Sequence, residues 1–266
     1  MTRVRGIDLA MFQGDPDFNA IARDESLVFA VAKATEGQGY YDPKWERSLR
    51  LAPSSFEFFG CYHVLRGTSD GALQAEHAGR QWERVAIECK AARSIALPVM
   101  MDFEIADKRA PEWLVDNAVR FRERIEALTG LRPLIYSYPS FLREQCGNLA
   151  PDALAECPQW PALYVGKRWS DMAAGFDPYE WLRTRGQLPA LWARSAWTVY
   201  QYDGDKGETY RGTDYDFNAA VSRDALLAIC GVSLAPTEPA PPPVPVEVPV
   251  AADFVRTLAD DYEGVT

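Results

Sequence analysis

Two carboxylates separated by one residue, Asp102 and Glu104, end the apolar run 97–101. Successive side chains of a strand point to opposite faces, so a strand over this run would place both acids on one face. Two like charges held side by side repel, which favours retention of one proton on the pair near neutral pH. A protonated carboxyl beside a carboxylate can act as a general acid with an anionic neighbour. Taken alone, however, such a pair is more often two solvated acids at a strand end.

Other polar residues fall at or near the ends of further predicted strands. Catalytic groups of parallel barrels lie at the carboxyl ends of the strands, so these positions are candidates for one site. Each has a simpler interpretation: a cap or turn residue for either Asp, a structural Lys–Glu ion pair, core packing for the tyrosines. Together they predict a single acidic mouth. They are Asp8, Lys33, Glu36, Tyr62, Tyr136, Gln201 and Asp216.

The elements that must position these residues alternate along the first half of the chain. Short β-branched and aromatic runs predict strands at 4–9, 27–33, 58–65, 95–104 and 134–138. Amphipathic stretches between them predict helices at 43–51, 72–90 and 111–128. The second half is less regular, with predicted strands at 163–167, 198–202 and 215–217.

This pattern predicts an α/β fold, a modified TIM-like barrel with five βα units followed by three less regular strands. The alternative is an open doubly wound sheet. No glycine-rich phosphate loop follows the first predicted strand, so the nucleotide-binding version of that sheet lacks its sequence fingerprint.

Composition excludes several classes of function. The chain has 266 residues, 47% of them hydrophobic, which suffices for a large core. A formal net charge of −10 argues against nucleic-acid binding. No apolar stretch approaches the roughly 18 residues of a membrane helix, so membrane insertion is not expected. The first residues lack the apolar core of a signal peptide, which predicts cytoplasmic synthesis.

Neither metal nor cofactor chemistry is expected. The two histidines, His63 and His77, have no metal-motif spacing, and His63 is predicted to be a hydrogen-bonded packing residue. The odd number of cysteines and the absence of a CxxC pair predict mostly reduced thiols. Cys146 and Cys157 are near enough in sequence to leave a disulfide open as an alternative. The cysteines are Cys61, Cys89, Cys146, Cys157 and Cys230.

The motifs form a recognisable series in both order and spacing. They are Gly6-Ile7-Asp8-Leu9-Ala10 with Gln13-Gly14, Lys33-Ala34-Thr35-Glu36-Gly37, Gly60-Cys61-Tyr62-His63-Val64, Asp102-Phe103-Glu104, Ile135-Tyr136-Ser137, Val199-Tyr200-Gln201-Tyr202 and Asp216-Phe217-Asn218. From Arg3 to Cys230 the chain resembles the glycoside hydrolase family 25 lysozymes, also called Chalaropsis-type muramidases. Ala10 departs from the family, which usually has Ser there.

The resemblance implies hydrolysis of the β-1,4 bond between N-acetylmuramic acid and N-acetylglucosamine in bacterial peptidoglycan. By motif, it implies Glu104 as proton donor with Asp102 as its partner, and Asp8 and Asp216 in the same acidic centre. The remaining positions, Tyr62, Tyr136, Glu36, Lys33 and Gln201, are expected to bind substrate. The N-acetyl group of the substrate can serve as internal nucleophile, which predicts a retaining, substrate-assisted reaction. Trp169, Trp181, Trp192 and Trp197 offer flat faces for sugars, and we expect two of them to touch glycan.

Two other functions stay open: a non-catalytic barrel that binds cell-wall glycan, and a barrel glycosidase acting on a different N-acetylated glycan. The biological setting we expect is a phage endolysin that reaches the wall through a separately encoded membrane pore, with a bacterial autolysin as the alternative. Residues 1–232 are predicted to be the catalytic barrel and 233–250 a proline-rich linker. The tail 251–266 is either the start of a truncated wall-binding module or a terminal helix.

Overall fold

The computed structural model describes residues 2–204 and 209–232. The predicted linker at 233–250 and the tail at 251–266 lie outside the described residues. Within the described part, no helix is long and apolar enough to cross a membrane.

Eight strands follow one another around a twisted sheet in the order β8-β7-β6-β4-β2-β1-β12-β9. Neighbours from β1 to β8 are parallel, whereas β12 is antiparallel to both β1 and β9. These strands are β1 (Val4–Leu9), β2 (Leu27–Glu36), β4 (Phe58–Val64), β6 (Met100–Asp102), β7 (Leu134–Ser137), β8 (Gln159–Pro161), β9 (Val199–Asp203) and β12 (Asp216–Ala220). Short strands β3 (Tyr40–Tyr41) and β5 (Ile95–Ala96) add to β2 and β4, and β10 (Thr209–Tyr210) pairs with β11 (Thr213–Asp214).

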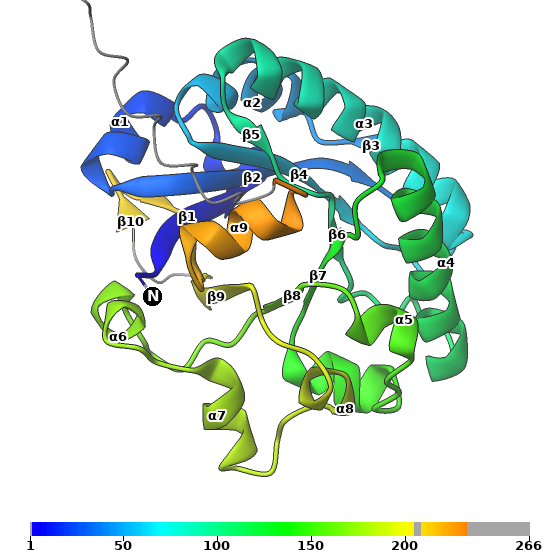
Figure 1. Cartoon of the computed structure of the whole chain (residues 1–266). Helices are drawn as coiled ribbons and strands as arrows, with labels where there is room; N and C mark the ends of the chain where they lie inside the picture. Colours follow the sequence, from blue (N-terminus) through cyan, green and yellow to red (C-terminus); the bar gives the residue numbers. More distant parts are fainter. Residues whose placement is uncertain (1, 205–208, 233–266) are drawn as a thin grey trace, which may run out of the picture. The chain divides into compact units, whose positions relative to one another are not determined.

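The two ends of this sheet meet at a narrow seam between β8 and β9. Isolated parallel bridges join Gln159 to Trp197 and Ala162 to Gln201, and the Thr198 amide donates to the Gln159 carbonyl at 2.9 Å. The sheet is therefore a nearly closed barrel, and the predicted α/β barrel class is confirmed (Figure 1).

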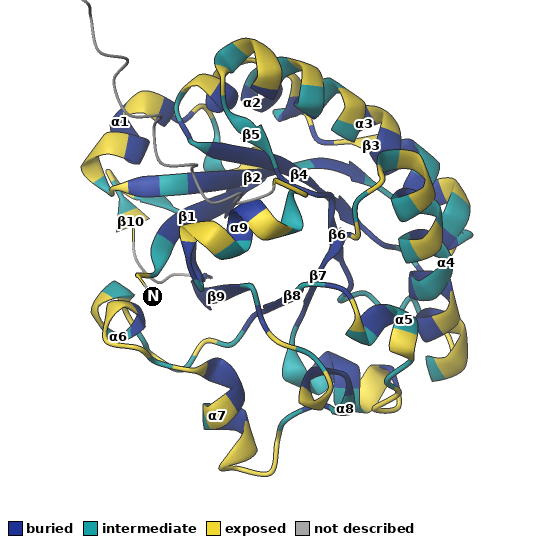
Figure 2. Ribbon diagram, in the orientation of Figure 1, coloured by how far each residue is buried: buried dark blue, intermediate teal, exposed yellow. Residues whose placement is uncertain are grey.

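Helices cover the outside of the barrel and leave its polar residues at one end. The helices α1 to α5 follow the first five parallel strands of the barrel, as the predicted βα units require. Figure 2 shows the strands buried along most of their length, while the long helices α3 and α4 expose their outer faces. The helices are α1 (Phe18–Asp24), α2 (Trp45–Leu51), α3 (Gly71–Ala92), α4 (Pro111–Thr129), α5 (Asp152–Ala155), α6 (Trp169–Ala173), α7 (Pro178–Arg183), α8 (Ala190–Ala193) and α9 (Arg223–Ile229).

Sequence signals explain where the two long helices begin and end. Asp70 caps α3, because its side chain accepts hydrogen bonds from the first amides of the helix. Pro111 starts α4, and Gly130 ends it in a left-handed conformation with φ 73°. Three short turns complete the elements: 3-10 helices η1 (Met11–Gln13) and η2 (Ala52–Ser54), and the π-helical η3 (Phe141–Gln145).

Strand alternation sorts the side chains of β1 between two apolar layers. Ile7 and Leu9 face the layer under the helices, so Gly6 and Asp8 face the barrel interior. A Cβ on Gly6 would lie 2.5 Å from the ring of Phe29, so only glycine fits there. The interior layer also contains Leu226 and Leu227 of α9, which fill the end of the barrel opposite the carboxyl ends of the parallel strands.

The predicted strands 27–33 and 215–217 end three residues before β2 and β12 do, and two other predicted strands were wrong by more. The predicted strand 95–104 is divided into β5 and β6, because Pro98 between them has no amide hydrogen for a ladder. The predicted strand 163–167 is a loop, and the strand there is β8, which precedes it and ends at Pro161. Cys146 and Cys157 are free thiols, so the alternative of a disulfide between them is wrong.

Candidate active site

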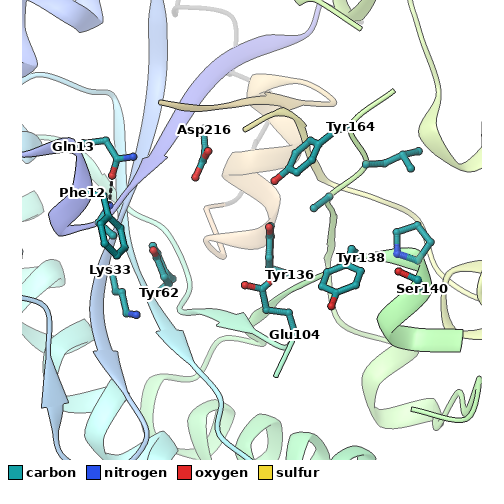
Figure 3. A pocket seen from close by; sticks show the side chains of 14 residues that line it. Phe12, Gln13, Lys33, Tyr62, Glu104, Tyr136, Tyr138, Ser140, Tyr164 and Asp216 are labelled. Atoms are coloured by element: carbon teal, nitrogen blue, oxygen red, sulfur yellow. Dashed lines mark hydrogen bonds between the residues drawn. The ribbon is translucent and has the colours of Figure 1, made fainter. Parts of the chain in front are cut away.

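A pocket of about 660 Å³ opens at the end of the barrel where the parallel strands finish. Side chains from several strand ends and the loops that follow them surround it (Figure 3). Tyrosine rings and acids make up much of its wall, which suits a ligand with both apolar faces and hydroxyl groups. Its lining is Ala10, Phe12, Gln13, Lys33, Tyr62, Glu104, Tyr136, Tyr138, Pro139, Ser140, Ala162, Leu163, Tyr164 and Asp216.

Asp102 and Glu104 lie on the same side of the chain, as the alternation predicts. Phe103 between them points into the outer layer, where its ring is 5.1 Å from that of Phe141. The backbone beyond β6 stays extended against its neighbours, since the Phe103 amide donates to the Tyr136 carbonyl at 2.9 Å. Asp102 is buried under the pocket, and Glu104, half-buried, forms part of the pocket wall.

Burial gives the two acids different environments. Asp102 is 7% exposed, and its Oδ1 accepts no hydrogen bond from the described part of the chain. Burial, and then the charge of Glu104, hold the pKa of Asp102 well above its usual range, while Lys33 opposes this shift. The pair therefore retains a proton at a pH where isolated carboxyls have lost theirs.

Asp8 forms the second acidic position, next to Asp216 across the β1–β12 ladder. Gln201 Nε2 and Asn218 Nδ2 both donate to Asp8 Oδ2, each at 2.7 Å. Burial raises the pKa of Asp8 to about 7, against the two hydrogen bonds and with a further contribution from the charge of Glu104. Asp8 thus lies below the pocket, and Asp216 lines it.

A hydrogen-bonded network extends from Asp8 to the pocket wall. Gln201 Oε1 accepts from the hydroxyl of Tyr136 at 2.7 Å and also from the hydroxyl of Tyr164. Burial raises the pKa of Tyr136 well above its usual value, so its hydroxyl stays protonated as a donor. On the other side, Trp160 Nε1 donates to Asn218 Oδ1 at 2.9 Å. The orientation of both amides that hold Asp8 is thereby determined.

Paired charges line the opposite rim. Lys33 Nζ contacts Glu36 Oε2 at 2.7 Å, and Arg66 contacts the other oxygen of Glu36 at 2.6 Å. Arg66 also binds Asp107 through two nitrogens, at 2.8 and 2.5 Å. Lys33 lines the pocket, and Glu36 lies beside it. The two residues form an ion pair, as one interpretation of the sequence predicts.

The structure brings the predicted site residues together at one end of the barrel. Asp216, Glu104, Lys33, Tyr62 and Tyr136 line the pocket, and the other four lie beneath or beside it. Sequence reasoning missed Asn218 and Tyr164. Asn218 belongs to the quoted motif that begins at Asp216, and alternation along β12 gave a signal for it, whereas Tyr164 lies on a loop without periodicity.

The expected tryptophan contacts do not lie at this pocket. Trp192 and Trp197 are buried, Trp169 and Trp181 are partly buried in the outer layer, and none of the four lines the pocket of the described chain. The flat faces at the pocket come from tyrosine and phenylalanine instead. His63 is a packing residue, as predicted: it is bonded to Thr35 at 2.8 Å, and burial lowers its pKa to about 3.

Comparison with known proteins identifies the class. A sequence profile of the glycosyl hydrolases family 25 matches residues 7–209, and the chain belongs to this family. The lysozyme from Streptomyces coelicolor has the same fold, with a TM-score of 0.65 at 22% identity, over 86% of this chain and 98% of that one.

Two relatives with lysozyme or muramidase names are similar in sequence over part of the chain. An autolytic lysozyme of Clostridium acetobutylicum is 27% identical over 175 residues, which are 63% of this chain and 51% of that protein. An N,O-diacetylmuramidase of Chalaropsis sp is 28% identical over 158 residues, or 54% and 71% of the two chains. The chain thus spans about half the length of the first of these relatives.

Proposed function

We propose that this chain is a lysozyme, an N-acetylmuramidase that hydrolyses the β-1,4 bond between N-acetylmuramic acid and N-acetylglucosamine of bacterial peptidoglycan. The observation that carries this proposal is the Asp102–Glu104 pair on one face, with Glu104 in the wall of a pocket large enough for sugar rings. Membership of family 25 and the muramidase activity named for the Chalaropsis relative support the same substrate.

Glu104 is proposed as the proton donor because it forms the pocket wall beside the more deeply buried Asp102. In the reacting form, the proton that the pair retains lies on Glu104, and Asp102 is the carboxylate. As the bond from the anomeric carbon to the glycosidic oxygen breaks, Glu104 gives that proton to the oxygen. The carbonyl oxygen of the substrate N-acetyl group bonds to the anomeric carbon, and Asp102 orients the amide as positive charge develops. Water then opens this oxazolinium ion, and the Glu104 carboxylate takes up the proton that the water loses.

The other acids and tyrosines are proposed to hold the sugar. Asp216 lines the pocket, and Asp8 lies beneath it and adds negative charge to the same site when it is ionised. Tyr62 and Tyr136 keep their protons because burial raises the pKa of each hydroxyl well above its usual value. Gln201 aligns Tyr136, and the Lys33–Glu36 pair borders the pocket.

Digestion of purified peptidoglycan followed by mass spectrometry of the released muropeptides tests this function. We expect products that end in reducing N-acetylmuramic acid, and proton NMR at early times should show the β-anomer first, as retention requires. Glu104→Gln keeps the shape but has no proton to give, so hydrolysis should fall by at least 10²–10⁴-fold with unchanged circular dichroism.

Each alternative predicts a different result in the same experiment. A non-catalytic wall-binding barrel would pellet with peptidoglycan and release no fragments. A glycosidase for another N-acetylated glycan would release products from chitin oligomers and leave peptidoglycan intact. An α-anomer appearing first would replace the substrate-assisted step with direct attack of water, with Asp8 or Asp216 as its base.

The biological setting remains a proposal. We propose that the protein acts at the bacterial cell wall. Residues 1–232 would be the catalytic part and 233–250 a linker, and 251–266 would be either the start of a truncated wall-binding module or a terminal helix. In the endolysin hypothesis the protein is made in the cytoplasm and passes a separately encoded membrane pore. Lysis of cells only when such a pore is co-expressed would support it.

A further inference from the structure

Three surface hollows meet at Phe12, on the short turn η1. Phe12 and Lys33 line the catalytic pocket and also a neighbouring hollow of about 510 Å³, while Phe12 and Gln13 border a third hollow of about 440 Å³. Figure 3 shows the ring of Phe12 near Lys33 at one side of the catalytic pocket. The 510 Å³ hollow is lined by Met11, Phe12, Lys33, Glu36, Gly37, Tyr40, Arg66 and Thr68.

Three large apolar side chains face solvent at this hollow. Phe12 is 81% exposed, and its neighbours Met11 and Tyr40 are 39% and 42% exposed. A single exposed apolar residue needs no explanation, but neighbouring ones beside a pocket make a candidate binding surface. We name the surface formed by Met11, Phe12 and Tyr40 the apolar lip.

The turn that presents Phe12 is fixed on both sides. Gln13 accepts a hydrogen bond from the Ala10 amide at 2.8 Å and donates one to the Asp214 carbonyl at 3.1 Å. The Met11 amide donates to Asp42 Oδ2 at 3.0 Å. Little backbone conformational entropy is therefore lost when a ligand packs on the ring, so the turn is preorganised for this contact.

The remaining lining of the hollow selects a neutral, hydroxylated ligand. Lys33 and Arg66 are both ion-paired, to Glu36 and Asp107, so the cations are already compensated. An anionic ligand would have to compete with these carboxylates. A pyranose ring matches better, because its C–H face packs on an aromatic ring while its hydroxyls reach paired charges and Thr68.

We infer that the apolar lip binds a further sugar ring of the same glycan strand, beyond the two rings at the scissile bond. This inference rests on the proposed lysozyme function and deepens it, because it assigns a residue, Phe12, to recognition of glycan length. The lip adjoins the catalytic pocket through Phe12 and Lys33, so a strand leaving that pocket meets the lip directly.

The test is the dependence of kcat/KM on glycan length, with stem-free peptidoglycan oligomers of increasing length. For the native chain, kcat/KM should rise at the length that fills the hollow. In Phe12→Ala, the ratio of kcat/KM for long to short oligomers should fall on the order of tenfold. Phe12→Tyr keeps a flat ring and should retain the ratio, whereas Phe12→Leu, apolar but not flat, should lose it.

Ile87 on α3 provides a matched control, because it is 66% exposed and lines none of the three hollows. Ile87→Ala should leave the length ratio unchanged. The inference is overturned if the ratio of kcat/KM for long to short oligomers is unchanged in Phe12→Ala or Phe12→Leu. It is also overturned if kcat/KM of the native chain does not rise with oligomer length. A loss seen only with stem-bearing substrates also overturns it and assigns the lip to the peptide. If the native chain cleaves no oligomer, the proposed function fails instead.

Discussion

Burial of the Asp8 carboxyl makes the free energy of unfolding depend on pH. It is 5% exposed, and burial raises its pKa to about 7, above the usual 3.8. Between these two values the folded chain binds more protons at this group than the unfolded chain does. The contribution of Asp8 to the free energy of unfolding therefore falls as the pH rises through that interval.

Asp8→Asn is expected to stabilise the fold, and to do so more at pH 8 than at pH 5. The amide oxygen can accept both hydrogen bonds that now reach Asp8 Oδ2, and it carries no buried charge. The gain in free energy of unfolding should be larger at pH 8 by about 3 kcal/mol. Denaturant titrations at both pH values measure it.

The exposed Asp116 on α4 supplies the control, since Asp116→Asn should shift stability similarly at both pH values. Equal gains for Asp8→Asn at pH 5 and pH 8 would contradict the raised pKa of Asp8. Loss of hydrolysis in the same variant would add a role for its charge in the reaction.

Much of the site could be predicted at the level of single residues, because it depends on motifs at strand ends. Asp102 and Glu104 share a face for the reason that alternation gives. Their unequal burial could not be predicted, because it depends on how deep β6 lies among its neighbours. Tyr164 was missed for a related reason: its hydroxyl meets Gln201, 37 positions away, and no local pattern records such a contact.

At the scale of elements, the loop that follows β6 and carries Glu104 is fixed by an ion-pair clamp. Its residues Asp107 and Lys108 have φ values of 48° and 57°, in the left-handed region that non-glycine residues rarely adopt. Arg66 holds Asp107 through two nitrogens, and the Gly67 amide donates to Asp107 at 2.8 Å. These bonds from the end of β4 offset the cost of the backbone conformation.

Arg66→Lys should lower kcat about tenfold with a small change in KM, because a single ammonium cannot reproduce the two-pronged contact with Asp107. Arg66 would then be a positioning residue for Glu104. Steady-state kinetics on glycan fragments, beside melting temperatures, measure the effect. The pair Arg84–Glu46 has the same two-pronged geometry on the outer helices, so Arg84→Lys is the control and should leave kcat unchanged. Equal kcat values for the two variants would contradict the positioning role.

The predicted elements were most accurate where periodicity was regular. β1 has the bounds that alternation predicts, and α4 differs only at its last residue. The largest errors fall where a proline or a loop interrupts the pattern, as at Pro98 and after Pro161. In these places the bounds of a strand depend on pairing with strands distant in sequence, and the periodicity of a single sequence does not reveal that pairing.

At the scale of the whole barrel, the seam between β8 and β9 is its weakest junction. Two isolated bridges close it, whereas continuous ladders of several residues join β1 to β2 and β2 to β4. Tyr164 lines the pocket beside the seam and donates to the buried Gln201, so local opening there would disturb the pocket wall.

Amide hydrogen exchange should therefore be faster at the seam than in the rest of the barrel. The Thr198 and Leu163 amides, which bond across it, are expected to exchange at least about tenfold faster than amides in the β1–β2 ladder. Exchange followed by NMR resolves these amides individually. Amides of α9, such as that of Leu226, serve as an internal reference at the far end of the barrel. Equal protection at the seam and in the ladder would show that the barrel opens only as a whole.

The pairing of β1 with β12 has a consequence for the chain while it is being made. Asp8 and Asn218 are 210 positions apart, so one edge of β1 has no partner until nearly the whole barrel has been synthesised. At about 5–20 residues per second, that edge waits for roughly 10–40 s. An unpaired strand edge is a template for association with other chains. The nascent barrel is thus most prone to aggregation before β12 emerges from the ribosome.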